Sequence, residues 1–141
     1  MREPVLSAEE VNAYIDEVFP ETKGRYVCEE LWSMGARVRM EAGPDDLRPG
    51  GTVSGPAMFA LADCGMYMAL LGMIGRQPLA VTTNASIDYM RKPAPGPMIA
   101  KVRLLKVGRV LAVGDVLLGV KGVEGSVARA SLTYSIPPAP A

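Results

Sequence analysis

Asp63 is the residue of this chain best suited to acid–base chemistry. It is the only carboxylate between Arg48 and Arg76, and it lies in the middle of an apolar run that extends over residues 54–71. A charged group in such surroundings is costly unless it is paired or used. The chain contains no histidine. Asp63 is therefore the candidate general base that could take a proton from water.

Gly55 is the second candidate, eight residues before Asp63. At the start of a helix its N–H has no partner within the helix, and the helix dipole places positive potential there. Such a donor can stabilise a developing oxyanion. Eight residues span about 12 Å along a helix axis, so one helix cannot place both groups on one substrate carbonyl. Two antiparallel copies can, which predicts a site shared by the subunits of a dimer.

Each candidate also has a structural interpretation. Gly55 could be no more than a residue that is tolerated at a helix start. Ser54 is expected to be the N-cap of the helix, because no base is visible to activate it as a nucleophile. Asp63 could be a structural carboxylate held by a backbone N–H or by a hydroxyl. The hydroxyls considered for that role belong to Thr82, Thr83 and Tyr67.

Composition and charge exclude several classes of function. The 15 basic and 15 acidic residues cancel, which argues against nucleic-acid binding. Two cysteines without a C-x-x-C pair and without histidine argue against a disulfide framework and a zinc site, so we expect no metal and no cofactor. The first residues lack the apolar core of a signal peptide, which predicts a cytoplasmic protein. Residues 57–74 have the length of a membrane span, but Asp63, Gly65 and Gly72 argue against one.

The pattern of apolar residues predicts one domain over residues 1–141. A capping box at Ser7 and Glu10 begins a short helix in a lead-in over residues 1–24. Two strands joined by a tight hairpin precede the long apolar helix, and four strands follow it. We expect these strands at residues 26–32, 35–41, 79–90, 98–107, 110–120 and 127–136, and a disordered tail at 137–141.

The order of these elements predicts an α+β fold. Short connections between the last three strands indicate antiparallel neighbours in a meander. The apolar face of an antiparallel sheet must be covered, and only one helix is long and apolar enough to cover it. We therefore expect the sheet to wrap around that helix, which would then be buried nearly all round.

This layout, with the residues around Asp63, resembles the hotdog-fold acyl-CoA thioesterases, and most closely the PaaI-like (phenylacetate-pathway) branch. The family's helix start reads Asn-Pro-x-Gly-x-x-His-Gly-Gly, with a catalytic acid nine residues after the His. Here residues 48–56 read RPGGTVSGP, and Asp63 falls on the acid. Ser54 replaces the His, Arg48 the Asn and Pro56 the second Gly.

The resemblance implies that the N–H of Gly55 polarises a thioester carbonyl and that Asp63 acts as general base or as nucleophile. It implies that two domains pair into one continuous sheet with the sites at their interface. Many members of the family pair again, so a dimer or a dimer of dimers is expected. The expected partner is an acyl-CoA or an acyl-carrier thioester, with no nucleic-acid or membrane partner.

Other residues are candidates for substrate binding. Arg91 and Lys92, in the turn after a long strand, could bind the phosphates of coenzyme A, or they could belong to a solvated turn. Asn84 could hydrogen-bond substrate or serve the sheet edge, and Ser54 could touch substrate beside Gly55.

The acyl group needs an apolar slot. Phe59 and Met66 lie on the apolar helix beside Asp63 and could line such a slot, with adaptable methionine side chains. Tyr67, one turn after Asp63, could orient substrate or water. The alternative for all three is a place in the core.

Two functions follow from these residues. The first is an acyl-CoA thioesterase that works by carboxylate-assisted attack of water at a dimer interface. The second is a hotdog module that binds an acyl thioester without hydrolysing it, as a sensor or carrier-interacting protein. The replacements at Ser54 and Arg48 favour the second. A hotdog hydratase or dehydratase would need a histidine, which the chain lacks.

Overall fold

The computed structural model describes residues 2–138. Its elements are α1 (Ala8–Val18), η1 (Pro20–Thr22), β1 (Tyr26–Trp32), β2 (Gly35–Glu41), η2 (Pro44–Asp46), α2 (Gly55–Ile74), β3 (Val81–Tyr89), β4 (Pro97–Val107), β5 (Leu111–Val120) and β6 (Ala128–Ser135). The expected helices and strands are present, with strand ends within one or two residues of the predicted ones. Of the predicted tail, residues 137 and 138 have no regular structure, and residues 139–141 lie outside the described residues.

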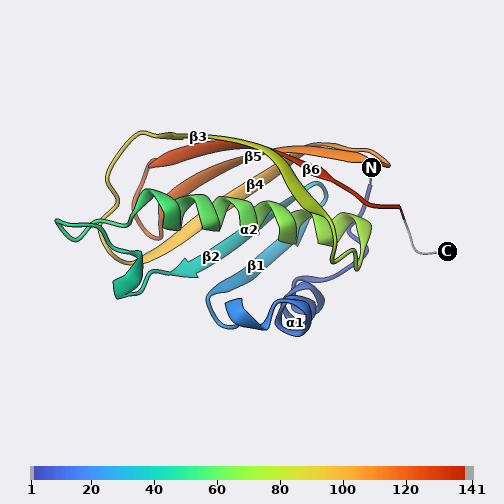
Figure 1. Cartoon of the computed structure of the whole chain (residues 1–141), viewed down its shortest axis with the longest axis horizontal. Coiled ribbons are helices and arrows are strands. Elements are labelled where there is room, and N and C mark those ends of the chain that lie inside the picture. Colours follow the sequence, from blue (N-terminus) through green and yellow to red (C-terminus); the bar gives the residue numbers. More distant parts are fainter. Residues whose placement is uncertain (1, 139–141) are drawn as a thin grey trace.

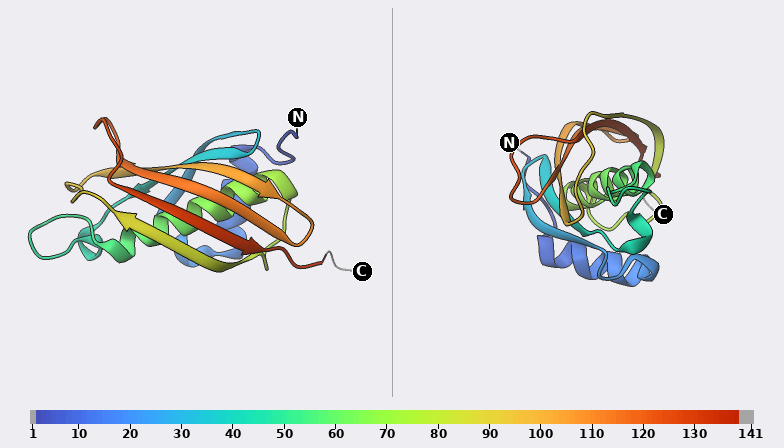
Figure 2. Two further views of the ribbon diagram at one scale, coloured as in Figure 1. Left: turned by 90° about the horizontal axis from the view of Figure 1, so that it is seen from above. Right: turned by 90° about the vertical axis from the view of Figure 1, so that its left-hand side faces the viewer.

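The six strands form one sheet in the order β1-β2-β4-β5-β6-β3, and every neighbouring pair is antiparallel. The meander of β4, β5 and β6 confirms the prediction from the short connections. The sheet curves around α2, which crosses it on the inner side (Figure 1; Figure 2). The predicted α+β architecture, a sheet wrapped around one long helix, is therefore confirmed.

The position of β3 was not predictable from its neighbours in the chain. It pairs with β6 and forms an edge of the sheet, whereas the next strand, β4, lies between β2 and β5. The connection from β3 to β4 passes around the start of α2 (Figure 1). There the N–H of Val53 donates to the main-chain oxygen of Pro93 at 3.1 Å. This connection thus ties the β3 edge to the beginning of the helix.

The inner face of the sheet packs closely on α2. Gly65 allows this close approach, since a Cβ there would lie 3.3 Å from side-chain atoms of both Ala100 and Val102, which is a tight contact. Met66, next to it, is fully buried, with 0% of its surface exposed. Close packing of this kind leaves the helix little freedom to shift relative to the strands.

The prediction that α2 is buried nearly all round is wrong along one face. Five residues at helical spacing are partly or largely exposed there, and we call them the open stripe: Phe59, Ala60, Asp63, Cys64 and Tyr67. The sheet covers only the opposite side of the helix. The apolar composition hid this because the stripe is itself mostly apolar.

Helix α1 packs against the edge strand β1 and also contacts α2, and it lies below α2 in Figure 2 (right). The predicted capping box is present: Glu10 N–H donates to the Ser7 hydroxyl at 3.1 Å, and Ser7 N–H donates to the Glu10 carboxylate at 3.0 Å. The helix buries Val11 and Ile15. Its C-terminal end reaches the open stripe of α2.

Helix α2 is long and apolar enough to cross a membrane by length and composition alone. However, 67% of its most apolar window is buried inside the fold. The central helix of a wrapped sheet can be as long and as apolar as a membrane span. The length and composition of α2 therefore do not indicate that it crosses a membrane.

Candidate active site

Asp63 lies near the middle of α2, on the open stripe, and its side chain is partly exposed. The hydroxyl of Thr82 donates to its Oδ1 at 2.5 Å, and the hydroxyl of Tyr134 donates to the same oxygen at 2.8 Å. Within residues 2–138, no group donates to Oδ2. The protein therefore holds one carboxylate oxygen in place and leaves the other available to water or substrate. Thr82 is one of the hydroxyls considered above as partners of Asp63 if this residue were a structural carboxylate.

Tyr134 on β6 is a site residue that the sequence analysis missed. Its hydroxyl also lies 3.0 Å from the main-chain oxygen of Asp63. Burial, and then the negative charge of Asp63, raise the pKa of Tyr134, so its hydroxyl keeps its proton and acts as a donor. A signal was present in the alternation of residues 127–136, which points this tyrosine inward. A buried tyrosine hydroxyl usually needs a partner.

Tyr67 presents its ring to the site. The ring stacks on that of Tyr134, with centroids 6.2 Å apart and planes at 19°. Its hydroxyl donates to the main-chain oxygen of Pro78 at 3.0 Å. Burial raises the pKa of Tyr67 to about 12. The hydroxyl is thus engaged away from the carboxylate, and the aromatic face is what a substrate would meet.

Two cavities that share lining residues reach Asp63. The larger, of about 340 Å³, is bounded by the end of α1, by α2 and by residues 78–82. The smaller, of about 190 Å³, is bounded by η1, the start of β1 and α2. Four residues line both: Phe19, Asp63, Tyr67 and Tyr134. The carboxylate therefore opens onto a hollow, as a catalytic group must.

Cys64 lines the smaller cavity but is not a nucleophile at neutral pH. Burial, and then the negative charge of Asp63, raise the pKa of its thiol to about 12. The thiolate is the reactive form of cysteine, and this environment suppresses it. Cys64 thus supplies only apolar surface beside the carboxylate.

The start of α2 is organised around Gly55. Ser54 is the N-cap, as predicted, and its hydroxyl accepts the N–H of Ala57 at 3.3 Å. Pro56 has no N–H. The N–H of Gly55 has no acceptor within the described part of the chain, while its main-chain oxygen accepts the hydroxyl of Tyr89 at 2.9 Å. One free donor is therefore left at the positive end of the helix dipole.

The loop before α2 is anchored by a buried carboxylate that the sequence analysis did not single out. Asp46 is only 5% exposed and forms an ion pair with Arg25. Its Oδ2 accepts the N–H of Gly43 at 2.7 Å, and its main-chain oxygen accepts the N–H of Ser54 at 2.7 Å. Asp46 thus connects the segment after α1 to the residue that caps α2.

The other predicted substrate-binding residues are spread over the molecule. Met66 is buried in the core, where no substrate could touch it. Phe59 is on the open stripe but lines neither cavity at Asp63. Asn84 is exposed and lies opposite Thr133 on the outer face of the sheet, away from α2. None of these three residues joins the group around Asp63.

Arg91 and Lys92 are exposed in the turn that follows β3. The next residue in that turn, Pro93, bonds to Val53 beside the start of α2. Neither cation has an ion-pair partner among residues 2–138. They therefore lie at the Gly55 end of the helix rather than at Asp63.

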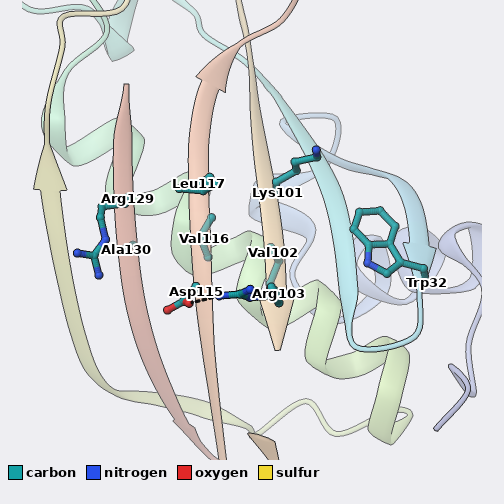
Figure 3. Close-up of a pocket in the computed structure, with 9 residues that line it drawn as sticks. All are labelled: Trp32, Lys101, Val102, Arg103, Asp115, Val116, Leu117, Arg129 and Ala130. Carbon is teal, nitrogen blue, oxygen red and sulfur yellow. Dashed lines mark hydrogen bonds and ion pairs between the residues drawn. The ribbon is translucent and has the colours of Figure 1, made fainter. Parts of the chain in front are cut away.

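A further hollow, of about 390 Å³, lies on the outer face of the sheet (Figure 3). Trp32 borders it from β1, and both charged and apolar residues of β4, β5 and β6 line the rest. Arg103 and Asp115 neutralise each other there at 3.1 Å. This hollow contains neither Asp63 nor Gly55. Nowhere in residues 2–138 do three or more His, Cys, Asp or Glu side chains gather as a metal site would require.

Comparison with known families agrees with this geometry. The family described as the thioesterase superfamily matches residues 50–121, which include α2, β3, β4 and β5. Among curated proteins, none matches this chain in sequence.

Three solved structures have the same fold. A protein from Silicibacter sp., described as a proposed thioesterase, is 50% identical over 97% of this chain and 96% of its own, with a TM-score of 0.90. The phenylacetic acid degradation protein PaaI from Thermus thermophilus, in a mutant form, is 25% identical over 84% of this chain and 99% of its own, with a TM-score of 0.71. Zebrafish thioesterase superfamily member 2 is 21% identical over 94% and 99%, with a TM-score of 0.81, and shows the fold alone.

Proposed function

Because this chain belongs to the thioesterase superfamily, in the PaaI-like branch of the hotdog fold, we propose that it hydrolyses acyl-CoA thioesters with Asp63 as general base. The observation that carries the proposal is the Asp63 carboxylate. It opens onto two cavities with one oxygen held by hydroxyls and the other free.

The reaction needs only a base and an oxyanion donor. The oxygen of a water molecule bonds to the thioester carbon while its proton passes to Oδ2 of Asp63. The N–H of Gly55 stabilises the oxyanion that forms. When the intermediate collapses, the carbon–sulfur bond breaks and the leaving sulfur takes the proton back from Asp63. The products are the free thiol and the carboxylic acid.

The two groups must come from different subunits. Gly55 and Asp63 are eight residues apart on α2, or about 12 Å along its axis. The edge strand β3 offers the means of pairing, because its outer side exposes unpaired main-chain groups. Two copies joined along β3 would extend the sheet and set their α2 helices side by side. Asp63 of one copy would then face Gly55 of the other.

The coenzyme A part of the thioester substrate would bind at the Gly55 end of this shared site. Arg91 and Lys92 lie in the turn tied to the start of α2 and are free to bind phosphate. The coenzyme A part of a bound substrate would therefore extend out of the site on the Gly55 side. Its acyl group would lie on the Asp63 side. The phosphopantetheine of an acyl-carrier protein carries the same thioester and is the alternative handle.

A module that binds a thioester without hydrolysing it is the second candidate. The family's helix-start histidine and asparagine are replaced by Ser54 and Arg48, and two hydroxyls already occupy Oδ1 of Asp63. These observations favour a site that has kept its shape and lost some of its catalytic groups.

Hydrolysis with and without the Asp63 carboxylate separates the two candidates. We expect the parent protein to release free thiol from acyl-CoAs and Asp63→Asn to lose at least about a hundredfold in kcat, the scale of a lost general base. Asp115→Asn, which removes a carboxylate on the outer face, is the matched control and should retain activity. Binding of acyl-CoA by the parent with no thiol release would establish the binding module. Unchanged activity in Asp63→Asn would show that another residue is the base.

A further inference from the structure

The walls around Asp63 are apolar and come partly from the N-terminal segment. Phe19, at the end of α1, lines both cavities. Val18 borders the larger cavity from the same side, and Leu79 and Val81 border it from the lead-in and start of β3. Of the three residues that we expected from the sequence to hold the acyl group, only Tyr67 lines these cavities. Phe59 and Met66 line neither of them.

These apolar side chains are exposed to an unusual degree for residues that lie together. Leu79 is 74% exposed, Val81 56% and Phe19 44%. A contiguous apolar patch on a protein surface generally marks a binding site. Here the patch adjoins the carboxylate that would activate the attacking water, so an apolar ligand group at Asp63 would cover it.

The charge of the cavities limits what such a group can be. Asp63 is the only formally charged side chain at neutral pH that lines either cavity, and no Lys or Arg of residues 2–138 does so. A second carboxylate brought in by a ligand would meet no Lys or Arg of this subunit in either cavity and would be repelled by Asp63. Burying it there without a partner would be costly.

We propose, resting on the thioesterase function above, that this site selects thioesters of neutral hydrocarbon acyl groups and that Phe19 determines this specificity. The acyl chain leaves the carbonyl at Asp63 and lies along the ring of Phe19, between the two cavities. Tyr67 and Tyr134 form the opposite wall. Short acyl groups do not reach Phe19, and acyl groups that end in a carboxylate are rejected.

Acyl-CoAs matched in length test the charge selection. We expect kcat/KM for hexanoyl-CoA to exceed that for adipoyl-CoA, which has the same carbon count and a terminal carboxylate, by at least about a hundredfold. Equal values for the two substrates would overturn the proposal. Binding of non-hydrolysable thioether analogues of both, measured by calorimetry, should show the same preference. This binding measurement tests the cavity even if the protein hydrolyses no thioester.

Phe19→Ala tests the residue. It removes the ring but keeps the main-chain bonds of this segment, from Phe19 N–H to Ile15 and from the Thr22 hydroxyl to Phe19. We expect kcat/KM for decanoyl-CoA to fall about tenfold, mainly through KM, while acetyl-CoA stays within about twofold. Phe19→Leu should restore most of the loss. Val110→Ala, which shortens an exposed apolar side chain far along the chain, is the control.

The results also distinguish failure of this proposal from failure of the proposed function. No thiol release from any substrate, combined with binding of the hexanoyl analogue and weaker binding in Phe19→Ala, would reject hydrolysis and keep the acyl site. Hydrolysis with the same dependence on chain length in Phe19→Ala and the parent would reject the role of Phe19. Binding of neither thioether analogue would reject the acyl site itself.

Discussion

At the scale of single residues, the hydrogen bonds around Asp63 define which of its oxygens can react. Thr82 and Tyr134 both donate to Oδ1, from β3 and β6 respectively. Two donors from different strands fix the plane of the carboxylate, so that Oδ2 points to a constant position. A base must lie within hydrogen-bond distance of its water, and this constraint would orient Asp63 for the role that we propose for it.

Tyr134→Phe removes one of these donors and keeps the ring that stacks on Tyr67. We expect kcat to fall about tenfold with KM little changed, because the carboxylate loses a donor that orients it as a base. Steady-state kinetics at neutral pH measure the effect. Tyr67→Phe, which breaks only the bond to Pro78, is the control. An unchanged kcat in a variant that has only lost stability would mean that Tyr134 serves packing alone.

At the scale of elements, the start of α2 depends on the loop before it. Asp46 joins Arg25, Gly43 and Ser54 through one side chain and one carbonyl. Burial opposes ionisation of Asp46, but the hydrogen bonds from Arg25 and from the Gly43 N–H outweigh it and hold the pKa of its carboxyl below the usual range. The position of Gly55 therefore rests on an ion pair that is formed outside the helix.

Asp46→Asn should lower the free energy of unfolding by about 2 kcal/mol at neutral pH, because Arg25 loses its charged partner. The folded pKa is depressed, so the stability that Asp46 contributes is present above the unfolded pKa, about 4, and is lost as pH falls through the folded pKa. The difference from the parent should thus shrink below about pH 4. Urea unfolding at several pH values measures it. A difference as small as that of Asp45→Asn, at the exposed neighbour, would contradict the prediction.

Whether a feature of the fold or the site could be predicted from the sequence depends on how far apart in the chain the interacting residues are. Capping and alternation act locally, so the helices, the strands and the N-cap Ser54 followed from the sequence. The pairing of β3 with β6 is set by the path of the chain around α2, which no local pattern records. Phe19 and Tyr134 reach the site from opposite ends of the chain. Sequence spacing cannot bring such residues together, whereas Asp63 and Gly55 share one helix.

At the scale of the whole molecule, the proposed mechanism gives one copy of the fold two half-sites. One is the base, Asp63, at the middle of α2, and the other is the donor, Gly55, at its start, about 12 Å away. The edge strand β3 contacts both groups, because its Thr82 bonds to Asp63 and its last residue, Tyr89, bonds to Gly55. In a pair related by a two-fold axis, each base would meet the donor of its partner, so every dimer would contain two complete sites.

Mixing two inactive variants tests this sharing of sites directly. Gly55→Pro removes the N–H donor at a helix position where proline is tolerated, and the extended backbone of Ser54 suits a following proline. Gly55→Ala keeps the N–H and adds a Cβ 3.3 Å from the Tyr89 ring, so it controls for steric effects. We expect Gly55→Pro and Asp63→Asn each to be nearly inactive.

When the two variants are unfolded together and refolded in equal amounts, half of the dimers contain one chain of each kind. One of the two sites in such a dimer carries both substitutions, and the other carries neither. The mixture should therefore regain about a quarter of the parent's activity. If Asp63 worked with the Gly55 of its own chain, every site would carry one substitution and the mixture would stay inactive. That result, or a monomer by light scattering in the parent protein, would refute the shared site.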